Sequence, residues 1–149
     1  MRDRFHYATD KFTDYALRTL IYVASLNDER LTNISEITEL LGVQRSHMMK
    51  IVNKLAQLDY LETIRGRHGG IRLKMPAEQI YVGKLMRDIE PLNLINCSPE
   101  FCSITSACRL KNKIEQAKVA FLSELDECSI LSLVENNEEL MILLAPAKP

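Results

Sequence analysis

The segment from Asn33 to Leu73 limits the fold most, because it carries two short helical patterns followed by a basic hairpin. The first pattern begins at Asn33, with Glu36 three positions later as in a capping box, and ends at Gly42, which suits a left-handed C′ position. The second runs from about Arg45 to Leu58. Its predicted buried residues are Met48, Ile51, Val52, Leu55 and Leu58. Two short helices joined by a glycine-containing turn are typical of a helix-turn-helix.

The hairpin follows directly. Residues 60–64 and 71–73 are β-prone and flank the turn R-G-R-H-G-G at 65–70, so they predict a two-stranded wing. Residues 44–74 contain seven basic and two acidic residues, a net charge of +5 in a chain whose formal charge is -1. Taken by itself, this positive charge could belong to an ordinary solvated face. Together with the helix-turn-helix, the charge predicts binding to double-stranded DNA. The predicted DNA-binding residues are Arg45, Ser46, His47, Lys50, Arg65, Arg67 and His68.

The flanking segments predict helices. One begins at Thr13 as N-cap and ends at Asn27-Asp28, and another covers 77–90 and ends before Pro91. A long helix starts near Arg109, and its apolar seam suits a partner helix in a homodimer, although packing on its own domain would also use it. The seam consists of Leu110, Ile114, Ala117, Phe121, Leu125 and Cys128.

The expected fold is therefore mainly α with a small β-hairpin: a winged helix-turn-helix plus a long C-terminal dimerisation helix. Its expected parts are a 1–10 N-terminal extension, an 11–76 DNA-binding domain, a 77–96 connecting helix, a 97–108 cluster-binding loop and a 109–149 dimerisation helix with an acidic tail.

Three of the four cysteines, Cys97, Cys102 and Cys108, lie in one short segment with the spacing C-x4-C-x5-C. Clustered thiolates are soft ligands that favour iron–sulfur clusters, zinc or copper(I). The same residues could instead be buried core cysteines or form a redox disulfide with one thiol to spare. Cys128 lies outside the motif and is interpreted as core packing.

Several classes are excluded by what the sequence lacks. No run of about 18 apolar residues predicts a membrane span, and the charged first ten residues do not resemble a signal peptide, so a cytoplasmic protein is expected. We find no glycine-rich phosphate loop and no nucleophile–base pair at useful spacing, so the chain is not expected to be an enzyme.

Three stretches of the chain begin at Lys11 (K-F-T-D-Y-A-L-R-T-L), at Gly42 (G-V-Q-R-S-H-M-M-K-I-V-N-K-L) and at Arg65 (R-G-R-H-G-G-I-R-L). All three resemble the bacterial winged-helix regulators that carry iron–sulfur clusters, the IscR relatives. The loop P-L-N-L-I-N-C-S-P-E-F-C-S-I-T-S-A-C-R-L-K is most similar to their NsrR-like, nitric-oxide-sensing branch. The resemblance runs from Lys11 to the end of the long helix.

The resemblance implies a repressor that releases operator DNA when its cluster is nitrosylated. It implies cluster ligation by Cys97, Cys102 and Cys108, with Asp14 of the other subunit as the fourth ligand. One cluster is expected per subunit, with 4Fe-4S favoured over 2Fe-2S. IscR-like members use a histidine three residues after the last cysteine, where this chain has Lys111. Two alternatives remain open: a sensor of cluster supply or redox state, and a zinc or thiol-switch DNA-binding protein.

Overall fold

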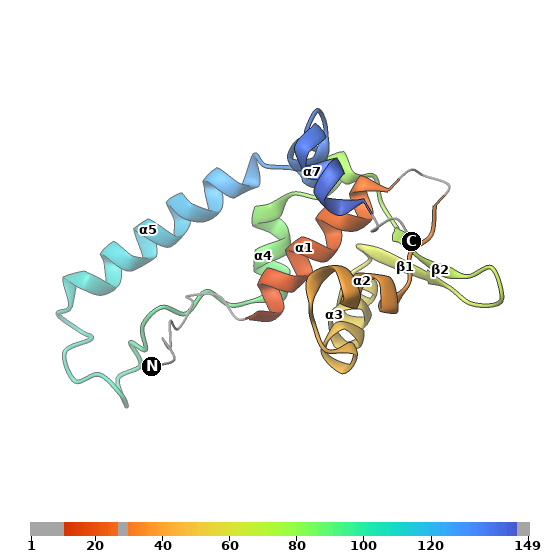
Figure 1. Cartoon of the computed structure of the whole chain (residues 1–149). Helices are drawn as coiled ribbons and strands as arrows, with labels where there is room; N and C mark the ends of the chain where they lie inside the picture. The colour runs from red at the N-terminus through yellow and green to blue at the C-terminus, as the bar shows by residue number, and fades with distance from the viewer. Residues whose placement is uncertain (1–10, 27–29, 146–149) are drawn as a thin grey trace, which may run out of the picture.

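The computed structural model describes residues 11–26 and 30–145, and Figure 1 shows their arrangement. Its central element is α1 (Lys11–Ser25), whose buried residues include Ala16, Leu20 and Tyr22. The predicted N-cap at Thr13 is wrong, because the helix already includes Lys11 and Thr13 lies buried within it. There its hydroxyl donates a hydrogen bond of 2.6 Å to the Glu90 carboxylate. The predicted helix end at Asn27-Asp28 lies outside the described residues.

The helix-turn-helix is confirmed as α2 (Ile34–Leu41) and α3 (Arg45–Gln57). Asn33 caps α2 by accepting a 2.9 Å hydrogen bond from the Glu36 backbone, and Gly42 ends it in the left-handed region at φ 64°. The Glu36 side chain does not complete a capping box. It accepts hydrogen bonds from the side chains of Tyr22, Arg30 and Thr32 instead, and thereby ties α2 to α1.

This network sets the charge state of Glu36. Burial alone would raise the pKa of its carboxyl, but the hydrogen bonds from Tyr22, Arg30 and Thr32 outweigh burial and hold the pKa below its ordinary value of 4.5. Because the pKa of Glu36 is lower in the folded protein than in the unfolded chain, its ionised carboxylate stabilises the fold. This stabilisation is complete at pH values above the ordinary pKa, and it is lost as the pH falls through the folded-state pKa.

Glu36→Gln should therefore lower the free energy of unfolding by about 2 kcal/mol near neutral pH. The deficit should shrink on acidification, because Glu36 of the unmodified protein then takes up its proton. Urea unfolding at neutral and acidic pH measures both values. Glu39→Gln, on an exposed position of the same helix, is the matched control and should cost less than about 0.5 kcal/mol at either pH. A deficit that does not depend on pH would contradict the assignment.

The predicted wing is confirmed as an antiparallel hairpin of β1 (Leu61–Ile64) and β2 (Gly70–Leu73), paired from Leu61↔Leu73 to Ile64↔Gly70. Gly66 lies in its turn at φ 109°, a conformation that side chains with a Cβ rarely adopt. Ile71 also pairs with Thr32, which joins the hairpin to the segment before α2.

The continuous helix predicted for 77–90 is wrong. The chain forms a 3-10 turn, η1 (Ala77–Gln79), then an extended step at Ile80 and Tyr81, and then α4 (Val82–Ile89). Tyr81 pairs with Ser129, and the flanking bonds are Val82 N to Cys128 O (2.9 Å) and Ile130 N to Ile80 O (2.8 Å). This pairing across the fold overrides the helical pattern. Glu90, before Pro91, is extended as expected.

The long helix is confirmed as α5 (Arg109–Asp126), followed by α6 (Ile130–Val134) and α7 (Glu138–Leu144). In Figure 1, α5 extends away from the body, with the loop that carries the cysteines at its far end. Leu122 is its only buried residue among those described, and the seam residues Leu110 and Phe121 are 58% and 49% exposed.

Cys128 packs partly buried against the core, as predicted, but it lies beyond the end of α5 rather than on the helix. No helix in the described ranges 11–26 and 30–145 is long and apolar enough to cross a membrane.

Candidate functional site

Helix α3 presents a polar, basic side to solvent. Arg45, Ser46 and Lys50 are all exposed, and they come from the first two turns of the helix. The Arg45 guanidinium donates a 2.7 Å hydrogen bond to the Ser35 hydroxyl, so it bridges the two helices of the helix-turn-helix. These are the groups that a helix lying in a DNA major groove would use for bases and phosphates.

His47 differs from its neighbours, because its side chain is only half exposed. Its ring meets the Tyr15 ring edge-on at 5.8 Å between centroids and lies 6.3 Å from the Phe12 ring. Below it, the Thr19 hydroxyl contacts the Met48 sulfur at 3.6 Å. His47 therefore lies at the junction between α3 and α1, and its predicted DNA contact remains a prediction.

The tip of the wing carries Arg65, Arg67 and His68, which are all exposed in the hairpin turn. Behind them an ion pair between Arg72 and Glu62 braces the two strands. The three tip residues are thus available to an external partner, and a narrow minor groove attracts arginine in particular.

The cysteine loop is a series of short turns. The Cys102 and Phe101 backbones both donate to Ser98 O, at 2.9 and 3.0 Å, and the Thr105 hydroxyl donates to Cys97 O at 2.6 Å. Cys97, Cys102 and Cys108 are each half-buried free thiols. Phe101 and Ile104, between them, are 76% and 64% exposed. Two large apolar side chains that are this exposed suit the loop to being covered by another surface.

The donor set of this loop fits a soft metal or cluster, since three thiols lie within one short segment and none is consumed by a disulfide. Their present arrangement does not form a site. Within residues 11–26 and 30–145, no three or more Cys, His, Asp or Glu side chains are grouped so that they could hold a metal ion.

Asp14, the predicted ligand from the other subunit, lies in the first turn of α1. Its carboxylate pairs with Arg18 at 2.7 Å, and its side chain is 45% exposed. It is not grouped with the loop cysteines within the described chain. A role for Asp14 across a dimer remains a prediction.

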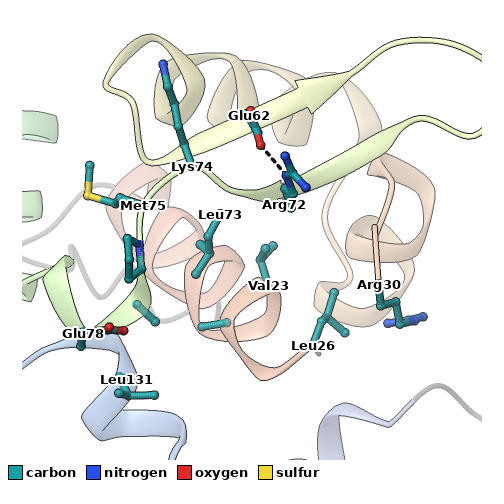
Figure 2. A pocket seen from close by; sticks show the side chains of 13 residues that line it. Val23, Leu26, Arg30, Glu62, Arg72, Leu73, Lys74, Met75, Glu78 and Leu131 are labelled. Atoms are coloured by element: carbon teal, nitrogen blue, oxygen red, sulfur yellow. Dashed lines mark hydrogen bonds and ion pairs between the residues drawn. The ribbon is translucent and has the colours of Figure 1, made fainter. Parts of the chain in front are cut away.

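A cavity of about 560 Å³ lies behind the hairpin, between the end of α1, the strand β2 and the turn that follows it (Figure 2). Val23, Leu26 and Leu73 give it an apolar wall. Each of its three basic side chains has a carboxylate partner in the described part of the chain. The pairs are Arg72 with Glu62, Arg30 with Glu36, and Lys74 with Asp59. This mixed and internally paired lining gives no chemical selectivity for a ligand.

Sequence reasoning missed the last turn of α4. Arg87 forms two hydrogen bonds with the Asp126 carboxylate on α5, at 2.5 and 2.7 Å. Asp88 accepts from the Tyr60 hydroxyl (2.5 Å) and from Lys84 (2.6 Å). Burial together with the Asp88 carboxylate raises the pKa of Tyr60, so the phenol keeps its proton and remains the donor. Only the polar face of the α4 pattern hinted at these contacts.

One family model matches most of the chain. The family described as "Rrf2: Iron-dependent Transcriptional regulator" matches residues 9–136. The fold is similar to that of T. potens IscR, with a TM-score of 0.72 and 18% identity, over 95% of this chain and 93% of that one. It is also similar to Staphylococcus aureus CymR, with a TM-score of 0.69 and 22% identity, over 85% and 97%.

A third similar structure is CymR (YrzC), the global cysteine regulator of B. subtilis, with a TM-score of 0.69 and 20% identity, over 85% of this chain and 95% of that one. At these identities the likeness establishes the fold.

Proposed function

Because the chain belongs to the Rrf2 family of iron-dependent transcriptional regulators, we propose that it is a homodimeric repressor that releases its operator in response to nitric oxide. Membership alone makes it a DNA-binding transcriptional regulator and not an enzyme. The finer proposal is carried by the cysteine loop, which concentrates three free thiols at the far end of α5. A regulator of transcription acts where the DNA is, so we place it in the cytoplasm.

In each subunit, the exposed groups of α3 and of the wing would contact DNA, and these two elements together are called the reading head. Arg45, Ser46 and Lys50 enter the major groove, with His47 at the edge of the helix next to α1. Arg65, Arg67 and His68 at the hairpin tip contact the adjacent backbone or minor groove. Two such heads bind half-sites spaced by whole helical turns, since a two-fold dimer matches a palindromic operator.

Lys50→Ala should weaken operator binding across all sequences and reduce the slope of log affinity against log salt by about one, because one phosphate contact is lost. Fluorescence anisotropy over a salt series measures this slope. The matched control is Lys113→Ala, which removes an equally exposed lysine from α5. If both variants keep the full slope, Lys50 makes no phosphate contact.

The three loop cysteines would hold the cluster, and Asp14 of the partner subunit would complete the ligand set. When bound, an iron–sulfur cluster supplies iron atoms that bind nitric oxide. In this proposal the loop closes as its three thiols converge. A carboxylate is a weaker ligand than the thiolates beside it, so the link through Asp14 would be the first to yield. Lys111, in place of the histidine of IscR-like members, favours the nitric-oxide branch over a sensor of cluster supply.

The decisive experiment is anaerobic purification followed by iron and sulfide analysis. We expect a coloured protein with both elements, and a loss of more than about a hundredfold in operator affinity after nitric oxide, equivalent to about 3 kcal/mol. Cys102→Ala should remove iron and sulfide, whereas the matched control Cys128→Ala should retain them. Asp14→Ala should leave a more labile cluster. A colourless protein with stoichiometric zinc would overturn the proposal.

A thiol switch is the second candidate, because the loop thiols are free and are not grouped for a metal in the part of the chain that the structure describes. One of the similar folds is the oxidized form of Staphylococcus aureus CymR. Here two loop thiols would form a disulfide, passing two electrons and two protons to an oxidant such as a peroxide. Iron-free protein whose operator affinity changes with peroxide and recovers with a dithiol would select this candidate.

A further inference from the structure

The last turn of α4 contacts three separate parts of the fold within four residues. Arg87 binds Asp126 at the end of α5, and Asp88 accepts a hydrogen bond from Tyr60, directly before the wing. Glu90 accepts one from Thr13 near the start of α1.

This turn also anchors the cysteine loop. The chain passes from Glu90 through Pro91 to Leu92, which is only 9% exposed, and then enters the loop. At its other end the loop continues into α5, which packs on α4. The arm made of the loop and α5 is therefore held at α4 by its two ends, Leu92 and the last turns of α5, so a change in the arm's shape acts first on this helix.

Two routes lead from α4 to the DNA-reading groups. Thr13 is 1% exposed, and it lies on the helix whose Phe12 and Tyr15 rings pack on His47 of α3. Tyr60, at 2% exposed, immediately precedes β1 of the wing. A buried hydroxyl that donates to a carboxylate makes a strong and directional contact, because the acceptor is charged.

We infer that the last turn of α4 is the joint that couples the cysteine loop to both the recognition helix and the wing, with Thr13 and Tyr60 as positioning residues. Both side chains are buried and bond to Glu90 and Asp88, so neither is offered as a contact to DNA or as a metal ligand. Each fixes α4 relative to one part of the reading head, so that loop and head move together. The inference rests on the proposed function only for DNA binding by the head, and it requires no metal.

Coupling between two sites is reciprocal, so DNA on the head must alter the loop. The test measures alkylation rates of the four cysteines by mass spectrometry in reduced, metal-free protein. Rates are compared with and without a duplex that the protein has selected from a random-sequence library. We expect the rates of Cys97, Cys102 and Cys108 to change by about tenfold on DNA binding. Cys128, outside the loop, is the internal control and should change by less than about twofold.

The variants isolate the joint. Thr13→Val and Tyr60→Phe remove a hydroxyl while keeping the shape of the side chain, and each should reduce the DNA-induced rate change to within about threefold of unity. Thr13→Ser retains the hydroxyl and should retain the full change. Asp59→Asn breaks an exposed ion pair with Lys74 that includes no residue of α4, and serves as the matched control. Circular dichroism establishes that each variant is folded.

Equal loop rates with and without DNA in the unmodified protein would overturn the inference, as would a full rate change in folded Thr13→Val and Tyr60→Phe. Should Thr13→Val not fold, the rate changes measured in Tyr60→Phe and Thr13→Ser still decide whether the inference holds. Failure of the proposed function looks different: the duplex selection recovers nothing, or anaerobic protein contains no iron and sulfide while the DNA-induced rate change persists.

Discussion

Phe121→Glu should convert the protein from a dimer into a monomer and lower its operator affinity by more than about a hundredfold. Phe121 lies on the apolar seam of α5, where 49% of its surface is exposed in the single chain. A charge at that position would be buried unpaired against a second α5, which strongly opposes association. Losing the dimer removes the gain from binding two half-sites at once.

Sedimentation and operator titration measure the two effects. Leu110→Glu, at the other end of the seam and 58% exposed, should act in the same way. Val119→Glu is the matched control, because Val119 is 62% exposed but lies on the opposite side of the helix from the seam. A Phe121→Glu protein that remains dimeric would show that α5 is not the dimer contact.

Gly83→Ala should lower the free energy of unfolding by about 2 kcal/mol, despite the better helix propensity of alanine. Gly83 lies where α4 crosses α5, and a Cβ there would come within 2.8 Å of both Asp126 N and Leu122 O. It would also lie 2.2 Å from the Asp126 side chain, which can move aside. The backbone contacts cannot be relieved without separating the two helices.

Thermal unfolding provides the measurement, and Asp126→Ala separates the two kinds of contact. Alone, Asp126→Ala removes an exposed ion pair with Arg87, and should lower the melting temperature much less than Gly83→Ala does. Combined with Gly83→Ala, it should not restore stability, because the backbone contacts remain. Full rescue by the second change would show that only the side chain was crowded.

Local signals predicted the reading head well. Asn33 as a cap, Gly42 in the left-handed region and the glycine-rich turn after Ile64 are each decided by a few adjacent residues. These features depend on capping and turn chemistry, which a short stretch of sequence fully contains.

The predictions that were wrong concern positions whose local structure depends on segments far away in the sequence. Thr13 has the chemistry of an N-cap, but its hydroxyl partner, Glu90, is 77 positions away. The break at Ile80 and Tyr81 exists because Ser129 and Ile130 pair with it. The loop is a case of its own: the sequence predicts its three sulfur donors, and within the described residues they are not grouped into a metal site.

The arm formed by the cysteine loop and most of α5 leaves the body at Leu92 and returns at Leu122, and these two buried residues line one shallow pocket. A segment whose entry and exit adjoin can be lengthened, shortened or re-equipped without rerouting the rest of the chain. The arm can therefore change during evolution, and with it the stimulus that such a protein detects, while the DNA-binding part stays the same.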